Sequence, residues 1–236
     1  MKKPLKDALK YCGLFAVDGG NPMWGYAQVD GSKVSAGNNY TCIECEIFKD
    51  EGGDMRLIPL SQGAKESTID INGYEFPDYA GIMGLKDEKI YRGSFIMKNS
   101  RGLASVFKIW KKAFEFINAL FQDKKQSKCI LAVNSGGFYA YATGEKGIGT
   151  VVKLCNYRML EFLQYYPPHG AYSTEYLIKA CDVLIEYNPT EALFYVGSNF
   201  EELLISIEGM QCQIMGTHIP VGDPLNLFYE SNKIRG

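Results

Sequence analysis

Apolar residues recur at helical spacing in three stretches of the chain, and each stretch precedes a run of strand-like segments. In the first stretch, residues 4–13, the apolar positions form one stripe: Leu5, Ala8, Leu9 and Cys12. Pro4 suits a first helical turn and Gly13 suits a helix end. We therefore expect a short amphipathic helix over residues 4–13.

The second stretch, residues 101–122, is the longest amphipathic pattern in the chain. Its apolar stripe consists of Leu103, Val106, Phe107, Trp110, Phe114, Ile117 and Phe121. At about 100° per residue, Ile109 and Phe116 are expected to widen this stripe on one side. The opposite arc carries Arg101, Lys108, Lys111, Lys112, Glu115, Asn118 and Gln122. A third helix is predicted over residues 174–187, with Ser173 as its N-cap and Asn188-Pro189 as its stop.

Strand patterns fill the intervals between the helices. Alternation is clear in YTCIECEIF, where Ile43, Cys45 and Ile47 share one face and Glu44 and Glu46 the other. Further strands are predicted in YAQV, KVSAG, MRLIPL, STIDING, KCILAVN, FYAYATG, IGTVVKL, ALFYVGS, LLISIEG and MQCQIMGTHI, whereas YRMLEFLQYY fits either a short helix or a strand. The predicted fold class is α+β: a helix followed by an antiparallel meander, three times over. VDGSKVSAGN and VNSGGFYAYATG echo one another about 105 residues apart, which suggests duplication.

The glycine-rich, irregular segment at residues 77–93 is a plausible domain junction. We expect a first domain at residues 1–85 with one clear helix, a second at 90–219, and a polar tail at 220–236 with an apolar knot at Leu225, Leu227 and Phe228.

Composition narrows the function classes. The 236 residues are 46% hydrophobic, with a formal net charge of −2, so a polyanion could be met only through a local basic patch. The longest apolar runs are too short for a membrane span, and Asp7 and Lys10 interrupt any signal-peptide core, so a cytoplasmic location is expected. Seven scattered cysteines favour reduced, buried thiols over a disulfide framework.

Motifs for catalysis or metal binding are weak. Cys42 and Cys45 have C-x-x-C spacing, but residues three apart in a strand point to opposite faces, and His169 and His218 are distant in sequence. GEKGIGT leads into a strand, so it is a hairpin turn and not a phosphate loop. We therefore expect no catalytic residue, no metal and no cofactor; a thiol- or metal-dependent enzyme is the third alternative.

Two of the predicted helices carry cations on their polar faces. The first offers Lys3, Lys6 and Lys10, and the second offers Arg101, Lys108, Lys111 and Lys112. Such lysines commonly serve solubility alone. Two basic helices packed on a sheet could instead contact phosphates without sequence preference. The third helix departs from this pattern, because Glu175, Asp182 and Glu186 outnumber Lys179.

Several segments together resemble the DNA sliding clamps, of the bacterial polymerase β-subunit type and its phage and eukaryotic relatives. KDALKYCGLFAVDGGNPMWGYAQVDGSKVSAGNNYTCIECEI looks like a first clamp module with an "atD"-like turn at residues 36–38. FINALFQDKKQSKCILAVNSGGFYAYATGEKGIGTVV and YSTEYLIKACDVLI followed by LLISIEGMQCQIMGTHIP are similar to later modules, and YEFP at residues 74–77 to a clamp domain end.

The resemblance implies a non-enzymatic processivity factor that encircles or associates with duplex DNA, with sheets outside and helices on one concave face. Two domains per chain imply a trimeric homo-oligomer, a replication polymerase or clamp loader as partner, and a phage or mobile element as a possible source. The absence of an obvious second helix between residues 60 and 95 departs from the clamp pattern.

The resemblance also marks candidate partner-binding residues: Met215, Ile219, Pro220, Leu225, Leu227 and Phe228. DPLNLF resembles the Leu-x-Leu-Phe peptide that clamp partners insert into a bacterial clamp. It would occupy the protein's own pocket, mark the chain as a clamp client, or act as a plain apolar anchor. The alternative function is a protein-interaction module of α+β fold without DNA function.

Overall fold

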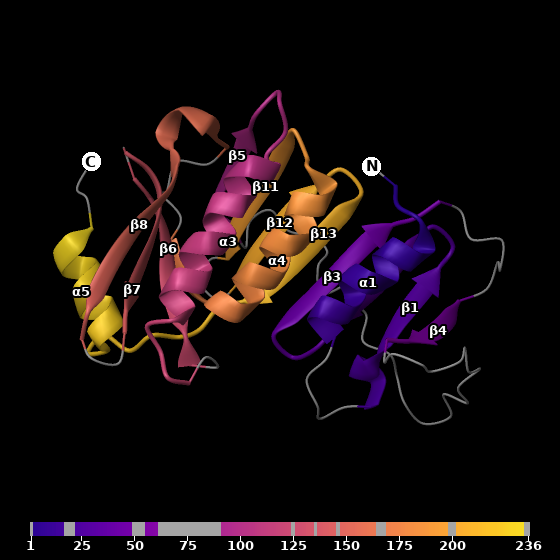
Figure 1. The fold of residues 1–236 in the computed structure, drawn as a ribbon, viewed down its shortest axis with the longest axis horizontal. Coiled ribbons are helices and arrows are strands. Elements are labelled where there is room, and N and C mark those ends of the chain that lie inside the picture. Colours follow the sequence, from indigo (N-terminus) through magenta and orange to yellow (C-terminus); the bar gives the residue numbers. More distant parts are fainter. Residues whose placement is uncertain are drawn as a thin grey trace. The chain divides into compact units, whose positions relative to one another are not determined.

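The computed structural model describes residues 2–16, 22–48, 55–60, 91–123, 126–134, 136–144, 147–163, 169–197 and 202–233 (Figure 1). The chain divides into two compact units. Unit 1 comprises Met1–Lys86 and Ser206–Gln213, and unit 2 comprises Asp87–Ile205 and Ile214–Gly236. The division falls within the last two strands of the chain, so both strands contribute residues to each unit.

Unit 1 is built from one helix on an antiparallel sheet. Helix α1 (Leu5–Ala16) packs on β1 (Tyr26–Asp30), β2 (Lys33–Gly37) and β3 (Thr41–Glu46), and β4 (Arg56–Pro59) pairs with the outer side of β1. A short 3-10 helix, η1 (Pro22–Gly25), precedes β1. Its core includes Phe15 on α1, Val29 and Val34 on the first hairpin, and Ile43 on β3. This core is the apolar stripe of α1 laid on the inward positions of the strands.

The first helix is longer than its sequence predicts. We expected it to end at Gly13, but α1 continues through Gly13 to Ala16. Phe15 and Ala16 are fully buried in the extra turn. Tertiary burial of this turn outweighs the cost of about 1 kcal/mol that glycine carries inside a helix.

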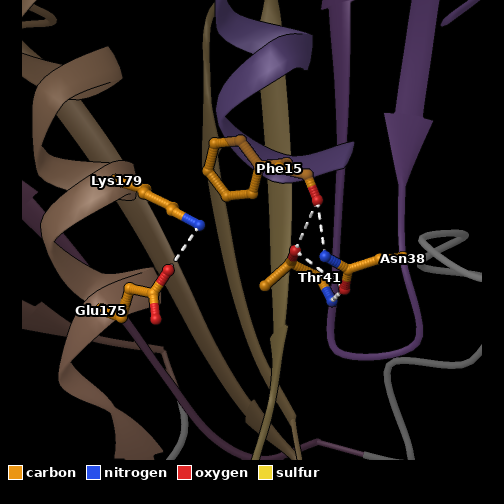
Figure 2. A network of polar contacts seen from close by, with 5 residues as sticks. All are labelled: Phe15, Asn38, Thr41, Glu175 and Lys179. Carbon is orange, nitrogen blue, oxygen red and sulfur yellow. Dashed lines mark hydrogen bonds and ion pairs between the residues drawn. The ribbon is translucent and has the colours of Figure 1, made fainter. Parts of the chain in front are cut away.

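The end of α1 is tied to the β2–β3 turn by polar contacts, as Figure 2 shows. The Phe15 carbonyl oxygen accepts hydrogen bonds from Asn38 Nδ2 at 2.8 Å and from Thr41 Oγ1 at 3.2 Å. Asn38 Oδ1 in turn accepts from the backbone N–H groups of Tyr40 and Thr41. Asn38 therefore caps the helix and shapes the turn, which explains the polar residue that follows the small Ala36-Gly37 pair.

Unit 2 contains two antiparallel sheets. In one, β12 (Glu202–Ile207), β11 (Glu191–Gly197), β5 (Tyr91–Lys98) and β9 (Leu160–Phe162) lie in this order, with β13 (Met210–Met215) beside β12. In the other, the order is β10 (His169–Ser173), β6 (Lys128–Asn134), β7 (Gly137–Thr143) and β8 (Gly149–Asn156). The strands are joined by tight turns, so each sheet is largely a meander.

Helices α3 (Ala104–Asn118) and α4 (Thr174–Tyr187) lie side by side across these strands (Figure 1). Trp110 on α3 is buried, and its Nε1–H donates to the Leu154 carbonyl oxygen at 2.9 Å. The Trp110 ring lies 5.0 Å from Phe138 on β7 and 5.6 Å from Phe194 on β11, measured between centroids. One aromatic cluster therefore joins α3 to both sheets of unit 2.

The described elements repeat one unit three times: α1 with β1, β2 and β3; α3 with β6, β7 and β8; and α4 with β11, β12 and β13. The predicted α+β fold class is confirmed. The third helix has the predicted bounds, although the Ser173 side chain makes no capping hydrogen bond. GEKGIGT leads into a strand as expected, and YRMLEF forms a 3-10 turn, η4 (Tyr157–Met159), followed by strand β9.

Three sequence predictions lie outside the described residues. They are the strand in STIDING, the YEFP segment at residues 74–77, and the expected lack of a second helix between residues 60 and 95, which falls mostly on such residues.

Two predictions are wrong. Ile109 and Phe116 do not widen the buried stripe of α3: they are 56% and 54% exposed, because α3 is covered on one side only. The tail beyond residue 220 is not simply polar, since it forms helix α5 (Pro224–Asn232), which packs on β6 and β7.

The start of α3 is fastened to the end of α4 by Asn188. Asn188 adopts the left-handed conformation (φ 44°, ψ 53°) that ends α4, and its Oδ1 accepts a hydrogen bond from Ala104 N at 3.0 Å. Gly102 approaches this side chain so closely that a Cβ there would lie 2.2 Å from Asn188 Oδ1. The junction thus requires a small residue at 102 and a residue tolerant of positive φ at 188.

We predict that Asn188→Gly and Asn188→Ala destabilise the chain to different degrees. Glycine loses only the bond to Ala104 N, a cost of about 1 kcal/mol, whereas alanine also carries a left-handed strain of about 1–2 kcal/mol. Urea unfolding followed by circular dichroism measures both, with the exposed Ser105→Ala as control. Equal midpoints for the two Asn188 variants would contradict the strain argument.

Candidate functional site

The exposed face of α3 carries the cations that the sequence singled out. Arg101, Lys108 and Lys112 are exposed, and within the described ranges no ion pair of theirs is found. Lys108 and Lys112 are four residues apart, so their side chains project from the same face, one turn from each other. This face therefore keeps positive charge available to an outside group.

Lys111 is different, because α4 neutralises it. Its Nζ lies 2.6 Å from Asp182 Oδ1 and 3.8 Å from Glu115 Oε1, and its side chain is only 32% exposed. The hydrogen bond to Asp182, together with the charge of both carboxylates, raises the pKa of Lys111 above the usual lysine value. Lys111 serves the α3–α4 contact first, and its charge is largely compensated.

Helix α4 compensates charge along its own length as well. Lys179 Nζ lies 2.8 Å from Glu175 Oε1, one turn earlier on α4 (Figure 2). Lys179 also lies over the Tyr176 ring, 5.1 Å from its centroid. The sequence prediction that this helix departs from the basic pattern of the others agrees with these contacts.

In unit 1, Lys6 and Lys10 are exposed on α1, and Lys3 lies just before the helix and is partly buried. The backbone of Lys3 bridges β3 from the N-terminal side: its N–H donates to the Glu46 carbonyl, and Phe48 N donates to its own carbonyl. Lys10 Nζ lies 5.9 Å from the Tyr11 ring centroid. Lys6 and Lys10 therefore present charge as expected, whereas the main chain of Lys3 has a structural role.

The predicted partner-binding residues divide into exposed and buried groups. Met215 and Leu227 are 37% and 55% exposed, and Pro220 is also exposed. Leu225 is only 2% exposed, in a cluster against which Ile219 and Phe228 also pack. The structure thus uses Leu225 and Phe228 to hold α5 on its own sheet.

A pocket of about 560 Å³ lies where α5 begins. Its walls come from the start of β6, the β7–β8 turn, the end of β10 and the first turn of α5, including Ser127, Lys128, Thr143, Thr217 and Asp223. Lys128 Nζ and Asp223 Oδ2 are 3.1 Å apart on its rim. Sequence reasoning missed this pocket because its walls are distant in the chain.

Chemistry based on thiols or metals finds no support in the geometry. All seven cysteines are free and buried. Burial raises the pKa of the Cys155 thiol to about 11, and the hydrogen bond with Cys45, together with burial, raises the pKa of Cys12 well above its usual range. Among the described residues, no group of three His, Cys, Asp or Glu side chains is placed to hold a metal ion. These thiols are core groups, protonated at neutral pH.

The C-x-x-C pair diverges as the strand geometry predicts. Cys45 interacts with Cys12 on α1, whereas Cys42 Sγ donates to Gln213 Oε1 at 3.5 Å. None of the helices in the described part of the chain has the length and apolar content needed to cross a bilayer.

Comparison with known proteins identifies the fold. No protein-family profile matches the sequence, and no curated protein matches it. Among solved structures, the chain is similar to the beta sliding clamp of Caulobacter crescentus, with 12% identity and a TM-score of 0.65 over 92% of this chain and 65% of the clamp. It is similar to DNA polymerase III subunit beta of Borrelia burgdorferi (12%, 0.65; 91% and 62%) and of Pseudomonas aeruginosa (11%, 0.63; 91% and 64%).

The fold is therefore that of the DNA sliding clamps, and the resemblance stated from the sequence is confirmed at this level. The chain spans about two thirds or less of the length of the clamps it matches. At 10–12% identity the match establishes architecture, and function must be argued from the residues at the surface.

We predict that Asp182→Asn lowers the pKa of Lys111 toward the ordinary lysine value, because the carboxylate favours the charged ammonium. NMR titration of the Lys111 side chain measures the shift. Glu115→Gln is the matched control and should have a smaller effect, since its oxygen is 3.8 Å away. Because the folded-state pKa is raised, the pair's stabilisation is present below the usual lysine pKa and is lost as pH rises through the raised value.

Proposed function

We propose that this protein is a non-catalytic, sliding-clamp-type processivity factor that holds a replication enzyme on duplex DNA. The observation that carries the proposal is the exposed cationic face of α3, presented on a sliding-clamp fold. Lys108, Lys112 and Arg101 leave their charge to solvent, whereas Lys111 is neutralised internally. Lysines on one exposed helical face suit loose phosphate contacts without sequence preference.

The first basic helix completes the proposal. Lys6 and Lys10 are exposed on α1, which occupies in its repeat the position that α3 occupies in the next. The proposed role requires both lysine pairs to face the same concave surface. It also places duplex DNA, a polymerase and a clamp loader among the partners, and a cytoplasmic site of action.

A second candidate function rests on a different observation. Ile109 and Phe116, two turns apart on α3, are more than half exposed beside the lysines. Exposed large apolar groups on one helix face suit a protein contact better than a phosphate contact. The alternative is therefore a protein-interaction module in which the lysines only improve solubility.

Charge reversal on α3 tests the DNA role. Lys108→Glu/Lys112→Glu should weaken binding to a blunt 30-base-pair duplex by about ten-fold or more at low salt. It should also reduce the slope of log affinity against log salt by roughly 2, because two phosphate contacts are lost. Fluorescence anisotropy across a salt series measures both quantities.

Lys33→Glu/Lys153→Glu is the matched control, since it makes the same charge change on strands β2 and β8. It should leave the slope close to that of the unaltered chain. If the α3 variant behaves like this control, the lysines of α3 do not contact DNA and the protein-interaction function is favoured. Phe116→Ser would then be the variant that loses partner binding.

Ring assembly is tested by analytical ultracentrifugation at micromolar concentration. If two clamp-like domains are present in each chain, closure requires a trimer, with three times the 26.4 kDa mass of one chain. A purely monomeric protein under these conditions would refute the closed ring.

A further inference from the structure

Strands β6 and β7 are buried on both faces, although a strand that faces solvent on one side normally alternates. Every residue from Cys129 to Val133 and from Phe138 to Ala142 is buried. On one face, Phe138 contacts Trp110 of α3. On the other face, the cover is α5 (Figure 1).

The register shows which residues lie under α5. Ile130 pairs with Tyr141, Ala132 pairs with Tyr139, and Ala171 on β10 pairs with Ile130. These five residues form a single apolar cluster with Leu225 and Tyr229. They lie on the face opposite Phe138, because side chains alternate along a strand. We name this surface, made by Ile130, Ala132, Tyr139, Tyr141 and Ala171, the α5 groove.

The contacts of α5 come from one side of a short helix. Leu225, Phe228 and Tyr229 stand at positions i, i+3 and i+4 and point to the groove. The Tyr229 ring meets Tyr141 edge to face at 5.0 Å. Phe228 lies against Gly149, where a Cβ would come within 2.0 Å of its ring. The glycine thus leaves room for this aromatic anchor.

A helix of nine residues is too short to be stable alone, so α5 depends on these anchors and on its cap. Asp223 caps it by accepting from Leu225 N at 2.8 Å and also binds Lys128. The chain leading to α5 is fastened at Thr217, whose N–H donates to the Ala171 carbonyl at 2.8 Å. Between Thr217 and Asp223 it runs without helix or strand, so α5 can leave the groove without disturbing β13.

The pocket of about 560 Å³ beside the first turn of α5 is not filled by α5 itself. A segment that carried the same three anchors and extended further at its N-terminal end would fill this pocket as well. It would reach Ser127, Lys128 and Thr143 in addition to the groove. Such a segment gains contacts that α5 lacks, which offsets the advantage that α5 has as a tethered group.

We propose that the α5 groove is a docking site for a partner protein and that α5 is its intramolecular occupant. The partner presents a short amphipathic helix with a leucine and two aromatic residues at i, i+3 and i+4, preceded by an acidic cap that pairs with Lys128. Binding displaces α5, so the partner surface is covered until a competing segment arrives. This proposal concerns the partner side of the proposed function and needs no DNA, so either can fail while the other stands.

The test uses a fluorescein-labelled peptide with the sequence of residues 221–233 as the probe. In the full chain, Leu225→Asp should release α5 and open the groove. The matched control is Leu227→Asp, on the same helix but 55% exposed. By fluorescence anisotropy, Leu225→Asp should bind the probe at least ten-fold more tightly than the unaltered chain, and Leu227→Asp should match the unaltered chain. A probe peptide that itself carries Leu225→Asp should not bind.

If Leu225→Asp is folded by circular dichroism and does not bind the probe, the proposal is overturned. If this variant does not fold, hydrogen exchange on the unaltered chain decides: α5 amides exchanging at least a hundred-fold faster than β7 amides support a detachable helix, and equal rates overturn it. Dimers of the unaltered chain that Leu225→Asp abolishes would show that α5 is exchanged between copies, which also overturns the partner proposal.

Discussion

The packing of Trp110 holds unit 2 together. Its ring contacts Phe138 from one sheet and Phe194 from the other, and its N–H satisfies a carbonyl of β8. Phe95 stacks on Phe194 at 5.0 Å and meets Phe138 edge to face at 5.4 Å, so the cluster closes on itself. Because α3 is fixed by this contact, the direction in which its opposite face points is fixed as well. The exposure of Lys108 and Lys112 is therefore a consequence of the aromatic core.

The same constraint explains the division of labour among the lysines of α3. The helix lies beside α4, which places Lys111 against Asp182. Lys108 and Lys112 are turned away from this contact and stay exposed. A net charge of −2 for the chain is compatible with a locally basic face, because pairing removes charge where helices meet and leaves it where they do not.

Much of the fold could be predicted from the sequence, since helical and strand periodicities are strong in α3, α4 and the hairpins. The errors came from tertiary contacts. The last turn of α1 is stabilised by burial of Phe15, which a local glycine signal cannot reveal. Ile109 and Phe116 fit an apolar stripe by angle alone, yet no element covers that side of the helix. Helix α5 had a local signal: an Asp223-Pro224 start and apolar residues at 225, 228 and 229.

The candidate site was predicted only in part. The lysine faces follow from helical geometry, so their exposure on α1 and α3 was accessible from the sequence. The pairing of Lys111 with Asp182 joins residues 71 positions apart, and the pocket beside α5 gathers five segments, so neither could be seen in a linear pattern. The similarity to bacterial clamps at 12% identity shows how little of this architecture depends on particular residues.

The two-sided burial of β6 and β7 has a consequence for biosynthesis. The segments Cys129–Val133 and Phe138–Ala142 are apolar, rich in β-forming residues and without charge, which is the composition of aggregation-prone strands. The helix that covers their second face is encoded about 80 residues later, so during translation the hairpin emerges with that face bare. A nascent chain stalled before residue 224 would display this surface to the cytosol, and chaperones that bind extended apolar segments would meet it there.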